Sequence, residues 1–203
     1  VRWFHPVRGA VPPTVFIPVA EKIGLINALG EWVLKTACAE AASWATPLKV
    51  SVNVSPIQLM NTSLTDTIIE VLHQTGLDPR RLDLEITESD VFNENTRSLE
   101  ILSQLREQGI QISIDDFGTG YSSLSRLSYF PFDKIKIDRS FVINIPEQKD
   151  DLDIVRLIIS MGKSLHMRIV AEGVETEEQL ASLQALGCDL VQGYLIGKPS
   201  PLR

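Results

Sequence analysis

The sequence is poor in cysteine, contains no long apolar run and carries no excess of basic residues. Its two cysteines, Cys38 and Cys188, lie far apart and outside any CxxC or Cys/His pattern. We interpret both as reduced, structural thiols. Neither a run of about 18 apolar residues nor a signal peptide is present. We therefore expect a soluble, cytoplasmic segment that makes no membrane contact.

The charge balance excludes one class of partner. The chain has 19 basic and 26 acidic residues, a formal net charge of -7. Proteins that bind long nucleic acid usually present a basic face to its backbone, so we expect no such partner. A small phosphate ligand held through metal ions remains possible. The length of 203 residues and the hydrophobic content of 44% predict a single domain over residues 1–203.

Short runs with a period of two alternate along the chain with longer segments of helical spacing. The runs are KVSVNVS (49–55), LDLEITE (82–88), IQISIDD (110–116), KIKID (134–138), RIVAEGVE (168–175) and DLVQGY (189–194). Helical patterns cover 19–41, with Gly30 as a possible break, then 66–74, 95–108 and 154–165. A capping box of Thr176 and Gln179 begins a last helix. Strand and helix in alternation predict a parallel sheet.

The phase of these strands favours a barrel. In 49–55 the valines share one face, whereas Ser51, Asn53 and Ser55 share the other. A doubly wound sheet is covered on both faces and reads as nearly continuous apolar runs, which these strands do not. The expected fold class is therefore α/β, a TIM (β/α)8 barrel. Its helices cover the apolar outside, and polar side chains converge at the carboxyl ends of the strands.

Polar residues do occur where the predicted strands end. They are Asn53, Glu85, Asp115, Asp116, Lys136, Glu172 and Gln192. Several carboxylates on one rim repel each other unless a cation compensates their charge. Because the set offers oxygen ligands without His or Cys, it suits Mg²⁺ or Mn²⁺ better than zinc. The adjacent aspartates could serve two metal ions, one of them as a bridge.

Each of these features also has an ordinary structural explanation. Paired aspartates before glycine are common in turns and at helix N-caps. Glu85 and Glu88 could be solvated charges, Asn53 could satisfy backbone groups, and Lys136 could be a core lysine whose amine reaches the surface. The functional interpretation depends on all of them lying at equivalent strand ends.

Eight motifs in one order strengthen the functional interpretation. They are VRWFHP, FIPVAEKIGLI, SVNVSP, LEITES, IDDFGTGYSSL, KIKIDRSF, VAEGVET and QGYLIGKP. Together they resemble the EAL-domain family of cyclic di-GMP phosphodiesterases, from the first residue to the last few. The resemblance implies a modified TIM barrel that hydrolyses cyclic di-GMP to linear pGpG with two Mg²⁺ or Mn²⁺ ions.

The resemblance also implies a ligand set for the metals. Asn53, Glu85 and Asp115 would hold one ion. Asp115 would bridge to a second ion, bound by Asp116 and Glu172, so that Glu172 also belongs to the catalytic residues.

Further roles follow from the same motifs. Lys136 would orient or deprotonate the attacking water, and Gln192 would help to place that water or the ligands of the second metal. Arg2 would contact a substrate phosphate. Glu88 would tether the loop after the aspartates through Ser122, which couples the site to dimerisation, so that a homodimer is expected.

One departure from the family pattern qualifies these expectations. The Glu-Ala-Leu tripeptide of the family stands directly before Val-Arg-Trp, and this sequence begins at Val1. We expect the first strand and most of the second to be missing, and residues 1–203 alone to be impaired. The alternative function is a cyclic di-GMP receptor or interaction module without turnover. The chain keeps every acid of the metal set within its bounds, which favours the enzyme.

Overall fold

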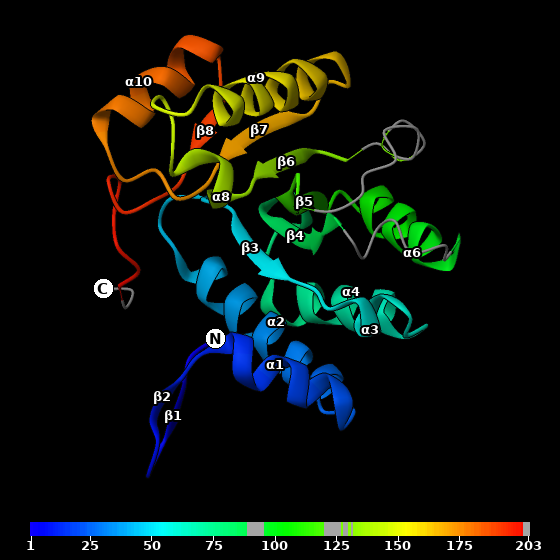
Figure 1. The fold of residues 1–203 in the computed structure, drawn as a ribbon. Helices are drawn as coiled ribbons and strands as arrows, with labels where there is room; N and C mark the ends of the chain where they lie inside the picture. Colours follow the sequence, from blue (N-terminus) through cyan, green and yellow to red (C-terminus); the bar gives the residue numbers. More distant parts are fainter. Residues whose placement is uncertain (89–95, 120–126, 128–129, 131, 201–203) are drawn as a thin grey trace. The chain divides into compact units, whose positions relative to one another are not determined.

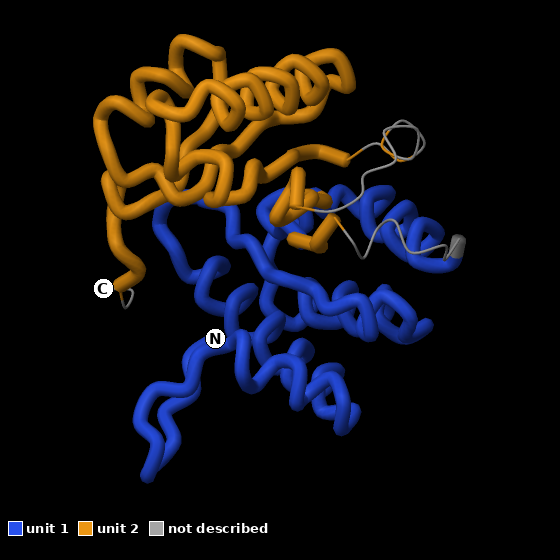
Figure 2. The backbone as a smooth tube through the Cα atoms, in the orientation of Figure 1, with its two compact units in different colours: residues 1–84, 95–111 blue, residues 85–94, 112–203 orange. Residues whose placement is uncertain are grey.

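The computed structural model describes residues 1–88, 96–119, 127, 130 and 132–200, and the chain divides into two compact units (Figure 2). Unit 1 comprises residues 1–84 and 95–111, and unit 2 comprises residues 85–94 and 112–203. The division falls within a strand, β4 (Leu82–Thr87), which contributes residues to both units.

Unit 1 begins with a short antiparallel hairpin, β1 (Trp3–His5) and β2 (Gly9–Val11), in which Trp3 pairs with Val11. Strand β3 (Val50–Asn53) follows two helices, and a 3-10 turn, η1 (Pro79–Arg81), leads into β4. The α-helices of the unit are α1 (Pro13–Lys22), α2 (Ile26–Ser43), α3 (Pro56–Leu59), α4 (Leu64–Thr75) and α6 (Thr96–Glu107).

Unit 2 contains most of the remaining strands and the helices between them. Its strands after β4 are β5 (Gln111–Phe117, of which all but Gln111 lie in the unit), β6 (Lys134–Ile137), β7 (Arg168–Ala171) and β8 (Leu190–Val191). Its helices are α8 (Arg139–Val142), α9 (Lys149–Ser164) and α10 (Glu177–Leu186).

Six strands form one curled parallel sheet in the order β3-β4-β5-β6-β7-β8, which is also their order in the sequence (Figure 1). The register is regular where β6 meets β7, with Lys134 beside Arg168 and Ile137 beside Ala171. This topology confirms the predicted α/β class, and it corresponds to part of a TIM barrel, whose complete form has eight strands.

Two helices illustrate why these segments fold as predicted. Helix α4 buries residues at three- and four-residue spacing, among them Leu64, Ile68 and Val71, and ends at Gly76 with φ +69°. The capping box that opens α10 is present, since Thr176 accepts a hydrogen bond from the backbone N–H of Gln179. Both helix boundaries were readable from the sequence.

The predicted stripe over residues 19–41 is wrong in part. Two helices, α1 and α2, cover it, and the chain turns between them at Gly24, where φ is +76°. Gly30 lies inside α2 and does not break it. A Cβ atom there would lie 2.0 Å from Nε2 of Gln58, so the glycine allows a close approach.

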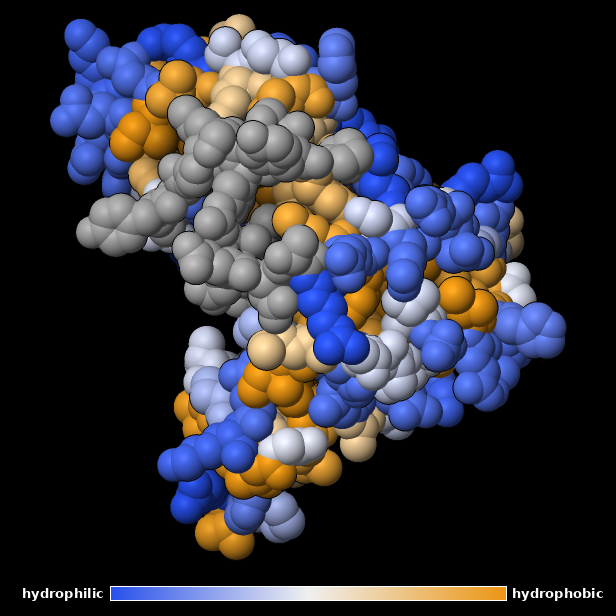
Figure 3. Space-filling model, turned by 90° about the vertical axis from the view of Figure 1, so that its right-hand side faces the viewer, coloured by the Kyte–Doolittle hydropathy of each residue, from blue (hydrophilic) through white to orange (hydrophobic). Residues whose placement is uncertain are grey.

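Apolar residues at and just beyond α1 are exposed, and two of them, Val19 and Ile23, were assigned to that stripe. Val15, Val19 and Ile23, spaced four apart at and beyond the helix, are 53%, 54% and 66% exposed. Hydrophobic surface is likewise interspersed with hydrophilic surface on the face shown in Figure 3. The buried side of α1 is reduced to Ala20, so the core of unit 1 comes mainly from the other elements.

The described part of the chain contains no helix with the length and hydropathy that a membrane span requires.

Candidate functional site

A buried lysine lies at the centre of a cluster of carboxylates in unit 2. Lys136, on β6, is only 6% exposed. Its Nζ atom lies 2.9 Å from Glu85 Oε2, 2.8 Å from Asp115 Oδ1 and 2.8 Å from Glu172 Oε1. The four side chains come from β4, β5, β6 and the residue after β7. Parallel strands that end at one edge of the sheet therefore bring together residues spread over the sequence.

The two adjacent aspartates share this site because β5 is irregular there. Ser113 pairs with Lys134 and Ile114 with Ile135, but the next pair is Phe117 with Ile137. One extra residue in β5 makes a β-bulge, which re-aims side chains. Successive residues of a regular strand point to opposite faces, yet carboxylate oxygens of Asp115, Asp116 and Glu172 all lie within 4.8 Å of one another.

The backbone of the bulge is unusual at Asp116. Its φ is +51°, in the left-handed region that Asp and Asn tolerate better than most residues. Local hydrogen bonds hold this conformation. The backbone N–H of Asp116 donates to Oδ1 of Asp115 at 3.1 Å, and the hydroxyl of Thr119 donates to the carbonyl of Asp116 at 2.8 Å.

Asp138 belongs to the site although the sequence interpretation missed it. Burial first, and then the charges of Asp115 and Asp138, raise the pKa of Asp116, whose carboxyl shares a hydrogen bond with that of Asp138. Asp138 also caps α8 by accepting from the backbone N–H of Ser140 at 2.9 Å. The signal in the sequence was its position two residues after Lys136, on the same side of the strand.

The electrostatics of the cluster show an excess of negative charge. Burial raises the pKa of Glu172; Lys136 opposes this effect, while Asp115 and Glu85 add to it. For Lys136, burial acts to lower the pKa, but the carboxylates around it outweigh burial and the pKa is raised. Lys136 therefore stays protonated at neutral pH, and one ammonium group faces four carboxylates when Asp116 is included.

These residues fit a divalent cation. The donors are carboxylate oxygens, which suit Mg²⁺ or Mn²⁺, and His and Cys are absent from the described metal-ligand cluster. Burial first, and then neighbouring carboxylates, raise the pKa values of Asp116 and Glu172, and a bound metal ion would favour their ionised forms. Asp115, Asp116 and Glu172 are the residues placed closely enough to share an ion.

A second buried glutamate contacts the backbone just after the bulge. Glu88 is 2% exposed, and its Oε2 accepts a hydrogen bond from the N–H of Gly118 at 2.7 Å. Its contact to the loop thus runs through Gly118. The predicted tether to Ser122 lies outside the described residues.

The remaining predicted site residues are Gln192, Asn53 and Arg2. Gln192 has an exposed side chain, and its backbone N–H donates to the carbonyl of Ala171 at 2.8 Å, one residue before Glu172. Asn53, at the end of β3, and Arg2, before β1, lie in unit 1. Their roles stay predictions from the sequence.

The fold and the site define a class of protein: a parallel α/β protein of the barrel type with an acidic, metal-compatible centre at its strand ends. The chain belongs to the EAL domain family, whose model matches residues 1–199.

The sequence similarity to other proteins extends over almost the whole chain. It is 56% identical over 202 residues to an uncharacterized signaling protein of Caulobacter vibrioides, covering 100% of this chain and 25% of that protein. It is 44% identical over 205 residues to the bifunctional diguanylate cyclase/cyclic di-GMP phosphodiesterase MucR of Pseudomonas aeruginosa, covering 99% of this chain and 30% of MucR. The chain thus spans about a quarter to a third of these relatives.

Solved structures agree with the assignment. The structure of the MucR phosphodiesterase in complex with cyclic di-GMP superposes with a TM-score of 0.94 at 45% identity, covering 98% of this chain and 83% of that one. The FimX EAL domain from Pseudomonas aeruginosa, bound to cyclic di-GMP, superposes with a TM-score of 0.91 at 26% identity, covering 98% and 81%.

Proposed function

We propose that this chain is the catalytic part of a metal-dependent phosphodiesterase that hydrolyses cyclic di-GMP to linear pGpG. The observation that carries the proposal is the cluster in which Glu85, Asp115 and Glu172 surround Lys136 while Asp116 approaches from the bulge. A relative that is 44% identical is named for cyclic di-GMP phosphodiesterase activity, and a similar solved structure contains that ligand.

The proposed ligands for the metal ions are the acids of this cluster. Asp115 lies between Glu85, on its neighbouring strand, and Asp116, next to it in the bulge, which suits a bridging role. When bound, two divalent cations would polarise the phosphodiester and stabilise the charge that grows on the attacking and leaving oxygens. The acidic protein could then hold an anionic substrate.

Lys136 has a narrower role in this proposal than the sequence suggested. Its raised pKa keeps it cationic at neutral pH, so it serves better to donate hydrogen bonds than to remove a proton. We therefore assign it to orienting the water and to holding the carboxylates together. Gln192, next to the last strand, is assigned to placing the water, as the family resemblance implies.

A receptor without turnover is the second candidate. The similar FimX EAL domain, bound to cyclic di-GMP, shows that ligand in a fold of this type. Retention of the whole acidic cluster favours hydrolysis, since binding alone does not require bridging carboxylates. The homodimer, the single domain and the cytoplasmic location stay predictions.

The test is a hydrolysis assay on the purified protein, with chromatographic detection of pGpG. We expect pGpG to accumulate with Mg²⁺ or Mn²⁺, to be lost in EDTA, and to return when the metal is restored. Tight binding of cyclic di-GMP without pGpG in either metal would instead support the receptor.

A further inference from the structure

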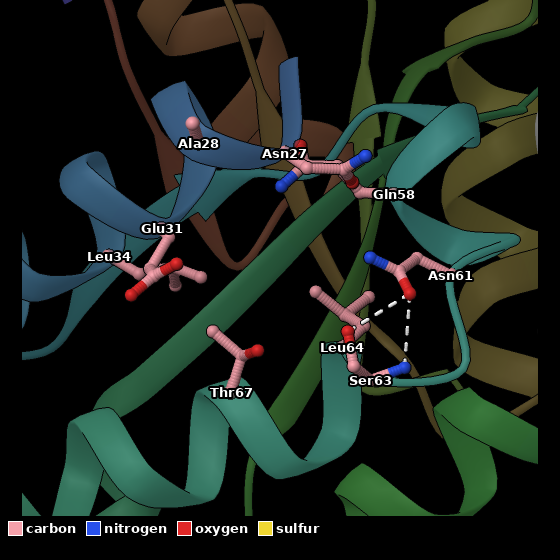
Figure 4. A pocket seen from close by; sticks show the side chains of 9 residues that line it. All are labelled: Asn27, Ala28, Glu31, Leu34, Gln58, Asn61, Ser63, Leu64 and Thr67. Carbon is pink, nitrogen blue, oxygen red and sulfur yellow. Dashed lines mark hydrogen bonds between the residues drawn. The ribbon is translucent and has the colours of Figure 1, made fainter. Parts of the chain in front are cut away.

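A polar pocket of about 200 Å³ lies within unit 1. None of the residues that line it belongs to the acidic cluster. The starts of α2 and α4 and the short helix α3 enclose it. Figure 4 shows Glu31 at one side of this unit 1 pocket and Gln58 and Asn61 at the other. Ligand pockets for drug-sized molecules measure about 300–1,000 Å³, so this one suits only a small molecule.

Gln58 lines the pocket and carries an amide donor for which no partner is found among the described residues. The residue is 4% exposed, and its Oε1 accepts a hydrogen bond from the backbone N–H of Ser55 at 3.1 Å. Its Nε2 packs against Gly30 and has no hydrogen-bond partner among the residues that the structure describes. This nitrogen is therefore free to donate a hydrogen bond to a small molecule in the pocket.

Asn61 presents a second amide donor with a fixed direction. Its Oδ1 accepts hydrogen bonds from Ser63, at 3.1 Å from the backbone nitrogen and 3.0 Å from the hydroxyl. These two bonds leave the Nδ2 group of Asn61 turned toward the pocket (Figure 4). An acceptor oxygen on a ligand could therefore bind both amides.

The ends of two helices add to the preference for an acceptor. Helices α2 and α4 begin at the pocket, and neither has a side chain that caps its N-terminus. Free N–H groups and the helix dipole favour negative charge at such an end. Together with Gln58 and Asn61, they make this side of the pocket suited to a carboxylate.

The opposite side offers negative charge. Glu31 binds Nζ of Lys35 through Oε1 at 2.7 Å, and its side chain is 47% exposed. A carboxylate accepts several hydrogen bonds, so its second oxygen can accept from a ligand ammonium group. The pocket thus joins a donor side to an acceptor side.

We propose that the unit 1 pocket binds a small zwitterion of the α-amino-acid type. Gln58 and Asn61 bind its carboxylate, and Glu31 binds its ammonium group. A phosphate ion would meet Glu31 with no lysine or arginine among the lining residues to offset the repulsion. A neutral polyol would use neither the charge of Glu31 nor the helix ends. This site is independent of the proposed phosphodiesterase activity.

The test is calorimetric titration of the whole protein with L-serine and with two probes that each lack one charged group. These probes are 3-hydroxypropionate, without the ammonium group, and ethanolamine, without the carboxylate; glycerol is the neutral probe. We expect saturable binding of L-serine, and binding at least about 10-fold weaker for each probe, because a charge-assisted hydrogen bond is lost. Absence of L-serine binding, or equal binding of any probe, overturns the proposal.

Two variants assign the binding to the pocket. Gln58→Glu keeps the size and the acceptor for Ser55 but replaces the amide donor, and Glu31→Gln removes the charge at the other side. Each should weaken L-serine binding by about 10-fold or more. Gln184→Glu, at an exposed position of α10, adds the same charge as the first variant and should bind normally.

Thermal unfolding followed by circular dichroism checks that each variant is folded. If Gln58→Glu does not fold, the half-exposed Glu31→Gln decides the question alone. Unchanged L-serine binding by a folded Glu31→Gln variant refutes the assignment to this pocket.

Discussion

At the scale of the residue, one carboxylate oxygen of Asp115 accepts two hydrogen bonds. Its Oδ1 accepts from Nζ of Lys136 at 2.8 Å and from the backbone N–H of Asp116 at 3.1 Å. One carboxylate thus supports both the buried lysine and the conformation of the bulge. Substitution by asparagine removes the negative charge of this side chain and keeps an acceptor oxygen.

Asp115→Asn is expected to slow the turnover of cyclic di-GMP at least about 100-fold. The amide keeps one acceptor oxygen but removes charge from a proposed bridging position between two cations. The activity should therefore fall by more than the 10- to 100-fold that results from altering a residue that only supports a metal ligand. The rate of pGpG formation at saturating Mn²⁺ measures this effect. Asp150→Asn, at an exposed position of α9, removes the same charge and should retain activity. Near-normal hydrolysis by Asp115→Asn would falsify the metal assignment.

The pKa shifts in the cluster predict how stability depends on pH. The folded state raises the pKa of Asp116 and Glu172, so their favourable contribution is complete at low pH and is lost as pH rises through the raised values. The pKa of Lys136 is also raised, and its contribution is lost only at high pH. The pKa of Asp78 is lowered to about 2, which matters only in strong acid.

In EDTA, the free energy of unfolding should therefore fall as the pH rises from about pH 4, the ordinary carboxyl range, to pH 7. Mg²⁺ should reduce this fall, because bound metal favours the ionised carboxylates. Urea unfolding at both pH values, with and without metal, measures the effect. Glu172→Gln should lessen the pH dependence in EDTA. Equal dependence with and without Mg²⁺ would contradict a metal site here.

At the scale of the element, the strands were predictable and the bulge was not. Alternation in 82–88, 110–116 and 134–138 placed β4, β5 and β6, since a strand with one polar face leaves a period of two. The same rule would send Asp115 and Asp116 to opposite faces. Only the pairing with the neighbouring strand reveals the extra residue in β5.

Helix boundaries were readable where a specific residue ends the helix. Gly76 and Gly187 both adopt left-handed φ values, of 69° and 76°, at the ends of α4 and α10. Gly24 and Gly30 were harder to interpret, because helical spacing can continue by chance through a turn. Gly30 differs from Gly24 in that it packs against Gln58, a tertiary contact that cannot be read from the spacing of residues in the sequence.

Gly118→Ala tests how strongly the segment after the bulge is constrained. Gly118 has φ +101°, and a Cβ atom there would lie 2.7 Å from Cε2 of Phe141. We expect a loss of about 1–3 kcal/mol in the free energy of unfolding, from overpacking and backbone strain. Activity should also fall, because Glu88 binds the same backbone N–H.

Gly197→Ala is the matched control for that variant. A Cβ atom at Gly197 would meet nothing within 4 Å, and its φ lies outside the left-handed region. Urea unfolding should show little change for this variant. Equal losses for both substitutions would mean that the environment of Gly118 is not the cause.

At the scale of the whole molecule, each compact unit contains one cysteine that can report on its opening. Cys38 lies in unit 1, is 0% exposed, and has a pKa raised to about 11 by burial. Cys188 lies in unit 2 and is partly exposed; burial raises its pKa as well. Because the thiolate is the reactive form, both should react slowly in the folded protein.

We expect iodoacetamide at pH 8 to modify Cys38 more slowly than Cys188, because only opening of unit 1 exposes the former. Mass spectrometry of each cysteine peptide over time measures the two rates. In urea, both cysteines should react at similar rates. Rapid modification of Cys38 without denaturant would show that its burial is not persistent.

The order of the motifs predicted the family, and the ends of the strands predicted most of the acidic cluster. Glu85, Asp115, Lys136 and Glu172 were found because strand ends in parallel sheets meet at one edge. Asp138 was missed because the sequence placed it inside the predicted strand 134–138, whereas in the structure it follows β6 and caps α8. The unit 1 pocket was missed too, because tertiary packing brings together its lining residues from α2, α3 and α4.

The bulge at Asp116 offers this chain a simple route between the two proposed functions. A left-handed backbone at this position also suits asparagine or glycine, so the charge can disappear while the strand keeps its irregular path. Lys136 would then have fewer negative charges to balance, and the fold would bear little strain from the change. A single-codon change at this position could thus turn the proposed hydrolase into the proposed receptor while the scaffold stays as it is.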